Sequence, residues 1–153
     1  MNLFIPIEIM KRELDYKIIL SCLLLENEQS AVIAQHDYLE KIMLKSFNGV
    51  YIGKNVMTKP DIYNNPYEVY EKIKINNISV IHLDEEGGIH AGNDDQIKET
   101  LDVRIDAKAL DSDDYLFIWG EFQSKHYISK LHKNSGPKII NTDFVKFDFT
   151  KKN

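Results

Sequence analysis

The sequence predicts an α/β fold, a three-layer Rossmann-like domain with a mostly parallel sheet. Short apolar runs that suit buried strands alternate along the chain with longer segments of helical periodicity. Alternation of this kind is typical of a parallel sheet with helices on both faces and right-handed crossovers. The chain has 153 residues, the length of one domain with a substantial core.

The first half of the chain is expected to supply three strand–helix units. Strands are predicted at residues 2–5, 29–34 and 50–53, and helices at 8–26, 37–44 and 67–75. In the first helix Leu14, Ile18, Cys22 and Leu25 fall at helical spacing, so we expect them to face the core. Asp37, with Glu40 three residues later, has capping-box spacing and predicts the start of the second helix. Residues 55–66, which are rich in Asn and Pro, are expected to form a surface loop beside a cleft.

The second half is expected to add three strands, at 80–83, 115–119 and 138–141. A helix is predicted over 121–133, with an apolar face of Phe122, Tyr127, Ile128 and Leu131. Residues 96–110 follow neither period, and we assign them no regular structure. Residues 142–153 form a tail whose apolar side chains predict docking against a partner. The expected domain therefore covers residues 1–141.

Composition excludes several classes of protein. A net charge of −5 argues against a nucleic-acid binder. A single cysteine, Cys22, excludes an internal disulfide and a cysteine-based zinc site. The sequence lacks an apolar run long enough to span a membrane, and its start lacks the basic region of a signal peptide, which favours the cytoplasm. The dinucleotide, P-loop and G-x-S-x-G fingerprints are absent, and the five histidines show no metal-ligand spacing.

An acidic turn is the central feature of the sequence. Asp84–Glu86 follow the apolar run 80–83 and precede Gly87–Gly88, which can turn the chain. Like charges this close can raise the pKa of one carboxyl group and make it a general base, at the strand end where open α/β sheets bind ligands. The alternative is a solvated acidic turn without chemistry. His90 is a further candidate for function, whereas His82 is expected in the core; no metal site is predicted.

Charged residues also mark the first strand–helix junction. Glu8, Arg12, Glu13 and Lys17 lie at spacings of four or one and could bind a polar ligand. The alternative is a solvated helix face with ordinary ion pairs.

Three blocks of the sequence resemble one protein family. They are PIEIMKRELDYK (Pro6–Lys17), LDEEGG (Leu83–Gly88) and FIWGEFQ (Phe117–Gln123). In order and spacing they are similar to the amino-terminal half of bacterial surface-carbohydrate biosynthesis proteins, glycosyltransferases of the two-domain GT-B architecture. The family patterns are P-x-E with R-E-x-x-x-K, then L-D-E-E-G, then W-G-x-x-Q.

The resemblance implies that a donor domain is missing from this chain. The family continues with a segment like T-G-N-P-R-F-D and a second domain for the nucleotide-sugar donor. Here the matching residues are Thr142–Asp148, in which Gly-Asn-Pro is replaced, and the chain ends at Asn153. It would be a fragment, a truncated homologue or one subunit of a split enzyme. We expect no cofactor on this chain and the nucleotide sugar in a separate domain.

The acidic block also resembles the acid-acid-Gly motif of sialyl- and Kdo-type transferases. The resemblance implies that Glu85 is the base that deprotonates the acceptor hydroxyl, with Glu86 and Asp84 tuning it. The His-Pro motif that such enzymes use for the donor is absent. The residues expected on the acceptor side are Glu8, Arg12, Glu13, Lys17, Gly87, Gly88, His90 and Gly120.

The leading hypothesis is the acceptor-binding, base-supplying domain of a glycosyltransferase in bacterial capsule or lipopolysaccharide synthesis. The alternative is a non-catalytic binding or regulatory module derived from one. A receiver-like domain fits poorly, because only Glu8 follows the first strand where an acidic pair is needed. Expected partners are a sugar or glycolipid acceptor and a donor domain or a second copy bound through the tail, without nucleic acid. The expected location is the cytoplasm, with peripheral attachment to the inner membrane left open.

Overall fold

The computed structural model describes residues 1–25, 29–54, 66–83, 91–131 and 136–142. Six strands form one sheet in the order β2-β1-β3-β4-β5-β6, and every neighbouring pair is parallel. The strands are β1 (Asn2–Pro6), β2 (Ser30–Ala34), β3 (Gly49–Gly53), β4 (Ile78–Leu83), β5 (Tyr115–Trp119) and β6 (Lys138–Thr142). The helices are α1 (Met10–Leu24), α2 (His36–Met43), α3 (Pro66–Ile75), α4 (Asp94–Arg104) and α5 (Gly120–Lys130), with a 3₁₀ turn at Ala107–Ala109. The predicted three-layer α/β fold is confirmed.

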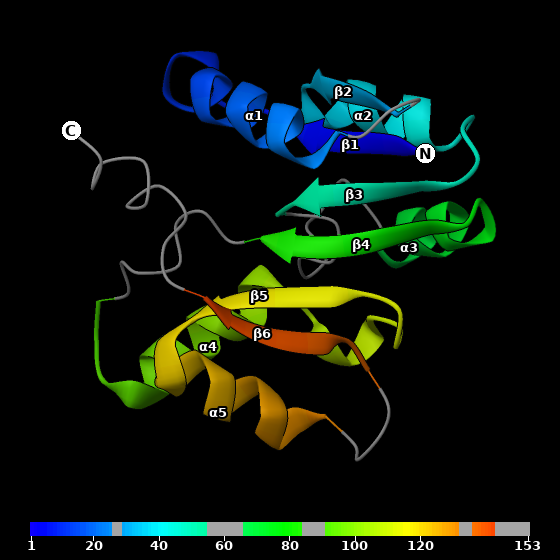
Figure 1. Ribbon diagram of the computed structural model, residues 1–153. Helices are drawn as coiled ribbons and strands as arrows, with labels where there is room; N and C mark the ends of the chain where they lie inside the picture. Colours follow the sequence, from blue (N-terminus) through cyan, green and yellow to red (C-terminus); the bar gives the residue numbers. More distant parts are fainter. Residues whose placement is uncertain (26–28, 55–65, 84–90, 132–135, 143–153) are drawn as a thin grey trace.

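The connections distribute the helices unequally over the two faces. The chain moves from β1 to β2 in one direction along the sheet, and all later connections move in the other. Right-handed crossovers therefore put α1 on one face and α2, α3, α4 and α5 on the opposite face. Helices α1 and α2 lie beside β1 and β2, and α4 and α5 lie beside β5 and β6 (Figure 1).

Two apolar clusters confirm this division. The larger cluster joins the four-helix face to the sheet and includes Leu39, Met43, Tyr70, Ile73, Leu101, Leu116 and Tyr127. The smaller cluster, on the α1 face, contains Leu3, Ile5, Ile52 and Leu83, with Leu20 and Leu25 packed against it. His82 is buried on the four-helix side of β4, as expected for a core histidine.

Helix α1 does not bury the face that the sequence predicts. Ile18 and Cys22 are exposed, and Leu14 and Leu25 are only partly buried. The buried residues are instead polar: Glu13, Lys17 and Ser21. Glu13 and Lys17 can be buried because they pair with each other and bond to the backbone that precedes the helix, and the Ser21 hydroxyl donates to the carbonyl of Lys17 within the helix.

Other element boundaries differ in detail. Helix α2 begins at His36 with Gln35 as its N-cap and without a side-chain capping bond, so Asp37 is not the cap. The segment 96–110, to which the sequence analysis assigned no regular structure, contributes most of helix α4. This helix begins with a capping box between Asn93 and Gln96. On α5, Phe122 and Ile128 are exposed and Gln123 and His126 are buried, contrary to the predicted face.

Some predictions concern residues outside the described ranges, namely the loop at 55–65 and the tail from 143. Among the described residues, no helix is both long and apolar enough to cross a membrane.

Candidate functional site

The carboxyl edge of the sheet between β1 and β3 is the first candidate site. The connection after β1 leads to β2 on one side, and the connection after β3 leads to β4 on the other, so the strand order reverses here. Open α/β sheets bind ligands at such switch points. The two strand ends lie close together, because a Cβ on Gly53 would come within 2.3 Å of the Pro6 ring.

Glu8 and Lys54 form an ion pair across this switch point. Glu8 follows the end of β1, Lys54 follows the end of β3, and Lys54 Nζ lies 3.0 Å from Glu8 Oε2. The Tyr51 hydroxyl donates a hydrogen bond to the carbonyl of Lys54 and so fixes the turn. Sequence reasoning predicted Glu8 but missed Lys54. The available signal was its position directly after a strand that ends in glycine.

Glu13 and Lys17 belong to the same cluster but lie beneath its surface. Their side chains are 0% and 3% exposed. Glu13 accepts a hydrogen bond from the Glu8 backbone N–H at 3.0 Å, and Lys17 donates to the carbonyl of Pro6. Both side chains therefore hold the chain between β1 and α1 in place. Because both side chains are buried, they affect a bound ligand only indirectly, by fixing the position of Glu8.

The electrostatics of the cluster favour an ionised Glu13. Burial alone would raise its pKa, but the bonds from the Glu8 N–H and Arg12 and the charge of Lys17 lower the pKa from 4.5 to about 2. Arg12 Nη2 lies 2.7 Å from Glu13 Oε1, and the Arg12 side chain is 45% exposed. Among the described residues, Glu8, Arg12 and Lys54 are the charged side chains at the switch point that are at least partly exposed, a mixed set that suits a polar ligand.

The predicted acidic block lies outside the described residues. This holds for Asp84, Glu85, Glu86, Gly87, Gly88 and His90. In sequence the block directly follows Leu83, the last residue of β4. Because β4 pairs in parallel with β3, its carboxyl end shares an edge of the sheet with Gly53 and Lys54.

Gly120 lies at the same edge, at the end of β5 and the first position of α5. Its φ of +70° is one that L side chains rarely adopt, and the space in front of it is open. The Gln123 side chain accepts a hydrogen bond from the Trp119 backbone N–H at 2.9 Å. The W-G-x-x-Q block therefore has a structural explanation: glycine allows the sharp turn and glutamine closes it.

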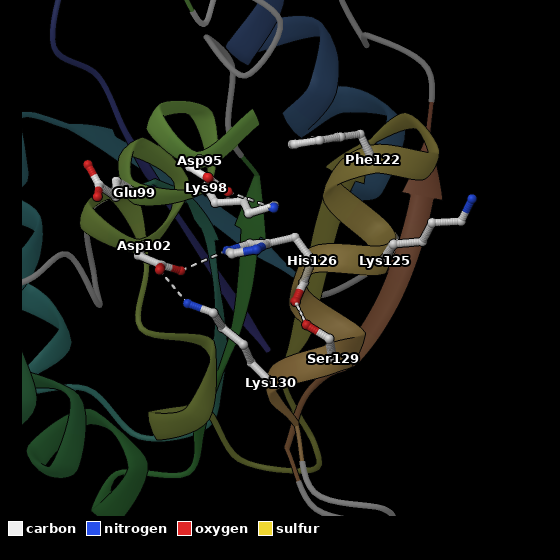
Figure 2. A pocket seen from close by; sticks show the side chains of 9 residues that line it. All are labelled: Asp95, Lys98, Glu99, Asp102, Phe122, Lys125, His126, Ser129 and Lys130. Atoms are coloured by element: carbon white, nitrogen blue, oxygen red, sulfur yellow. Dashed lines mark hydrogen bonds and ion pairs between the residues drawn. The ribbon is translucent and has the colours of Figure 1, made fainter. Parts of the chain in front are cut away.

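A second candidate is an open cavity of about 640 Å³ between α4 and α5 (Figure 2). Its lining residues are Asp95, Lys98, Glu99, Asp102, Phe122, Lys125, His126, Ser129 and Lys130. At its base Asp102 accepts from Lys130 and lies 2.8 Å from His126 Nε2. Burial would raise the pKa of Asp102, but these two partners lower it.

The contacts in this cavity point to a clamp between two helices. The Ser129 hydroxyl donates to the carbonyl of His126, so the described residues form no Ser-His-Asp chain. Lys98 is paired with Asp95, and Lys125 points away from α4 and pairs with Glu121 (Figure 2). Sequence reasoning gave no role to His126 or Asp102, because the two are 24 positions apart.

A third cluster, at the amino edge, consists of Asp111, Asp113 and Asp114. The ammonium group of Lys74 lies 2.7 Å from Asp113 and 2.9 Å from Asp114, with Asp111 at 3.7 Å. Asp114 is fully buried and also accepts bonds from the Tyr70 hydroxyl and the Val80 N–H. The cluster is therefore a lysine-filled brace between α3, β4 and β5.

Comparisons with models of protein families, with curated proteins and with solved structures found no match to this chain. The functional assignment accordingly depends on the residues at the switch point and on the blocks in which they occur.

Proposed function

We propose that this chain is the acceptor-binding, base-supplying domain of a glycosyltransferase that builds bacterial surface polysaccharide. One observation carries the proposal: the charged residues of the first sequence block meet at the switch point of the sheet. Glu8 is positioned by Glu13 and Lys17 and pairs with Lys54 at the edge where such sheets bind ligands. In sequence the acidic block directly follows Leu83, the last residue of β4.

The proposed chemistry is general-base catalysis. Glu85 takes the proton of an acceptor hydroxyl as its oxygen bonds to the anomeric carbon of a nucleotide sugar. The bond from that carbon to the nucleotide's phosphate oxygen breaks, and the nucleotide leaves from a separate donor domain. Glu8, Arg12 and Lys54 offer carboxylate acceptors and cationic donors for the hydroxyls of the acceptor.

A transfer assay tests the reaction. Labelled nucleotide sugars and polyprenyl-linked sugar acceptors are incubated with the chain alone and with a donor-type domain encoded beside it. We expect transfer only with both components, and we expect Glu85→Gln to lower it at least a hundredfold. The matched control is Glu99→Gln, an exposed change on α4. Transfer that survives Glu85→Gln would refute the role of Glu85.

A non-catalytic glycan-binding module is the second candidate, favoured by the replaced Gly-Asn-Pro positions in Thr142–Asp148. Calorimetric titration with the same acceptors distinguishes the two. Acceptor binding that Lys54→Ala weakens, together with an absence of transfer under all conditions, would support the binding module over the enzyme.

A further inference from the structure

Strand β2 forms one edge of the sheet. Among the described residues it pairs with β1 alone. The N–H of Ser30 and the carbonyl of Ala34 bond to the residues on either side of β1. Because the backbone groups of a strand alternate in direction, Ala31 and Ile33 direct their N–H and C=O groups away from the sheet. The edge therefore offers donors and acceptors to a further strand.

Neither charge nor proline protects the β2 edge. Residues 29–34, QSAVIA, include no charged residue and no proline. The opposite edge, β6, carries the exposed Lys138 and directly follows Pro137. Natural sheets block their edges against pairing with charged side chains and proline. Of the two edges, β2 is thus the one to which a strand can be added.

Helix α1 turns an apolar stripe towards the same edge. The stripe consists of Leu14, Ile18, Cys22 and Leu25, of which Ile18 and Cys22 are exposed. Its first three members each follow a residue of the buried polar row on the inner face, so they lie about 100° further round the helix. On the other side of that row, Leu20 packs against the cluster that includes β3 and β4. The stripe therefore faces outward beyond β2.

Helix α2 presents apolar side chains to this edge on the opposite face of the sheet. Its inner residues are Leu39 and Met43, and the exposed Tyr38 and Ile42 each precede one of them. Both helices run antiparallel to the strands but on opposite faces. A residue that precedes an inner position on α2 therefore turns to the same edge as one that follows an inner position on α1. The β2 edge thus lies between exposed apolar side chains on both faces.

We propose that a second copy of this chain pairs its own β2 with this edge. A twofold axis perpendicular to the sheet at Val32 makes the two β2 strands antiparallel. Ala31 of one copy then lies opposite Ile33 of the other. Each such pair exchanges both of its N–H···O bonds, and the pair occurs twice. The contact is isologous, so it closes as a dimer with one continuous sheet.

The stripe on α1 favours a second copy over a lone strand. It faces along the helix layer, so its cover is another helix in that layer. Helix α1 bonds to the end of β1 and packs on residues of β1 and β2, so its axis lies between these strands. With strands about 4.8 Å apart, the twofold axis places the two α1 helices about 10 Å apart, the usual distance between packed helices. The two stripes then cover each other.

The charges of both helices lie outside this contact. Lys17 bonds to the carbonyl of Pro6, the last residue of β1, so the first turns of α1, with Lys11 and Asp15, extend past the strand. The later members of the stripe lie beside β2. On α2 the nearest exposed charges, Lys41 and Lys45, are on the outer side of the helix, at the rim. The surface that meets its copy is therefore apolar.

The size of the edge suits a weak but specific dimer. Next to β2 the domain has three layers of about 10 Å each, and the extended stretch 29–34 is about 20 Å long. Each copy thus contributes roughly 600 Å², and the two together roughly 1,200 Å², which is the lower end of specific interfaces.

Sedimentation velocity between about 1 and 200 µM, the range of weak association, tests the proposal. We expect a monomer–dimer equilibrium that Ile18→Glu weakens at least tenfold, because the new carboxylate would be buried between the two stripes. The matched control is Ile19→Glu at the next residue of α1. Ile19 is exposed to the same degree, 43% against 45%, but points away from the edge, so this variant leaves the equilibrium unchanged. A wild-type chain that stays monomeric throughout would leave the edge to a strand of another protein and overturn the proposal.

A proline tests the strand pairing separately from the helix contact. Ala31→Pro removes an N–H that points out of the sheet and keeps the bonds between β1 and β2, so we expect a folded monomer by circular dichroism and sedimentation. Asn141→Pro is the matched control on β6. The Lys138 N–H bonds to Asp114 beside β5, so the Asn141 N–H points outward, and the control leaves the equilibrium unchanged. A dimer that survives Ala31→Pro, or that Ile19→Glu weakens as much as Ile18→Glu, would refute the arrangement.

Discussion

Replacing Glu13 by glutamine removes the charge that holds the switch-point cluster together. The change keeps the size of the side chain and an oxygen that can accept the Glu8 N–H, but it removes the carboxylate charge 3.7 Å from the buried ammonium group of Lys17. Removing one partner of a buried ion pair costs about 3–5 kcal/mol. The lowering of the Glu13 pKa from 4.5 to about 2 gives a consistent value of about 3 kcal/mol.

The pH dependence gives this prediction a second readout. A carboxyl group whose pKa is depressed in the folded state stabilises the protein above its unfolded pKa, and this contribution is lost as the pH falls through the folded pKa. The free energy of unfolding of the wild type should therefore fall between pH 4.5 and about pH 2 by more than that of Glu13→Gln.

Urea denaturation at a fixed temperature, from neutral pH downward, measures both quantities. Glu99→Gln, at an exposed carboxylate, is the control and should change the stability by less than about 0.5 kcal/mol. A Glu13→Gln variant as stable as the wild type at neutral pH, or one with the same pH slope, would refute the account of α1 as a helix held by buried charges.

Three further changes test the remaining features. Asp114→Asn should lower the free energy of unfolding by about 3–5 kcal/mol in urea titrations, because Asp114 is buried and accepts several hydrogen bonds. Asp113→Asn, at the exposed neighbour, is the control and should lower the free energy of unfolding by less than about 1 kcal/mol. Gly120→Ala should lower it by about 1–2 kcal/mol, because alanine is strained at a φ of +70°; an unchanged melting curve would contradict that conformation. Asp102→Asn should destabilise the protein at neutral pH but much less in acid, since the depressed pKa of Asp102 confers stability only while the carboxylate is ionised; a difference independent of pH would exclude the clamp with His126.

The sequence was sufficient to predict the fold because its strands are short apolar runs in a regular alternation with helices. In a parallel sheet covered on both sides such runs are distinctive. Strand β5 begins and ends where the sequence predicts, and β4 contains the predicted run at 80–83 and begins two residues before it. Helix α4 was missed although Asn93 and Gln96 had capping-box spacing, because Val103 and the many charges obscured its apolar positions.

The orientation of α1 could not be predicted from periodicity. Ile18 and Cys22 match the apolar pattern, but Glu13 and Lys17 gain partners in the backbone between β1 and α1, and those partners exist only in the folded chain. The same limit applies to the candidate site. Glu8 could be selected from its position after a strand, and the same signal was available for Lys54, whereas Asp102 acquires its role from a contact with His126, 24 positions away in the sequence.

The bond from the Glu8 N–H to Glu13 has a consequence for dynamics. This hydrogen bond joins Glu8, which faces the switch point, to helix α1. A molecule that binds Glu8 in its present position also favours the docked state of α1, and by thermodynamic linkage the docked helix strengthens the binding of that molecule to the same degree. The amide protons of α1 should therefore exchange more slowly with solvent when the switch point is occupied. Their exchange rate can report on occupancy from the far end of the helix, whatever chemistry follows.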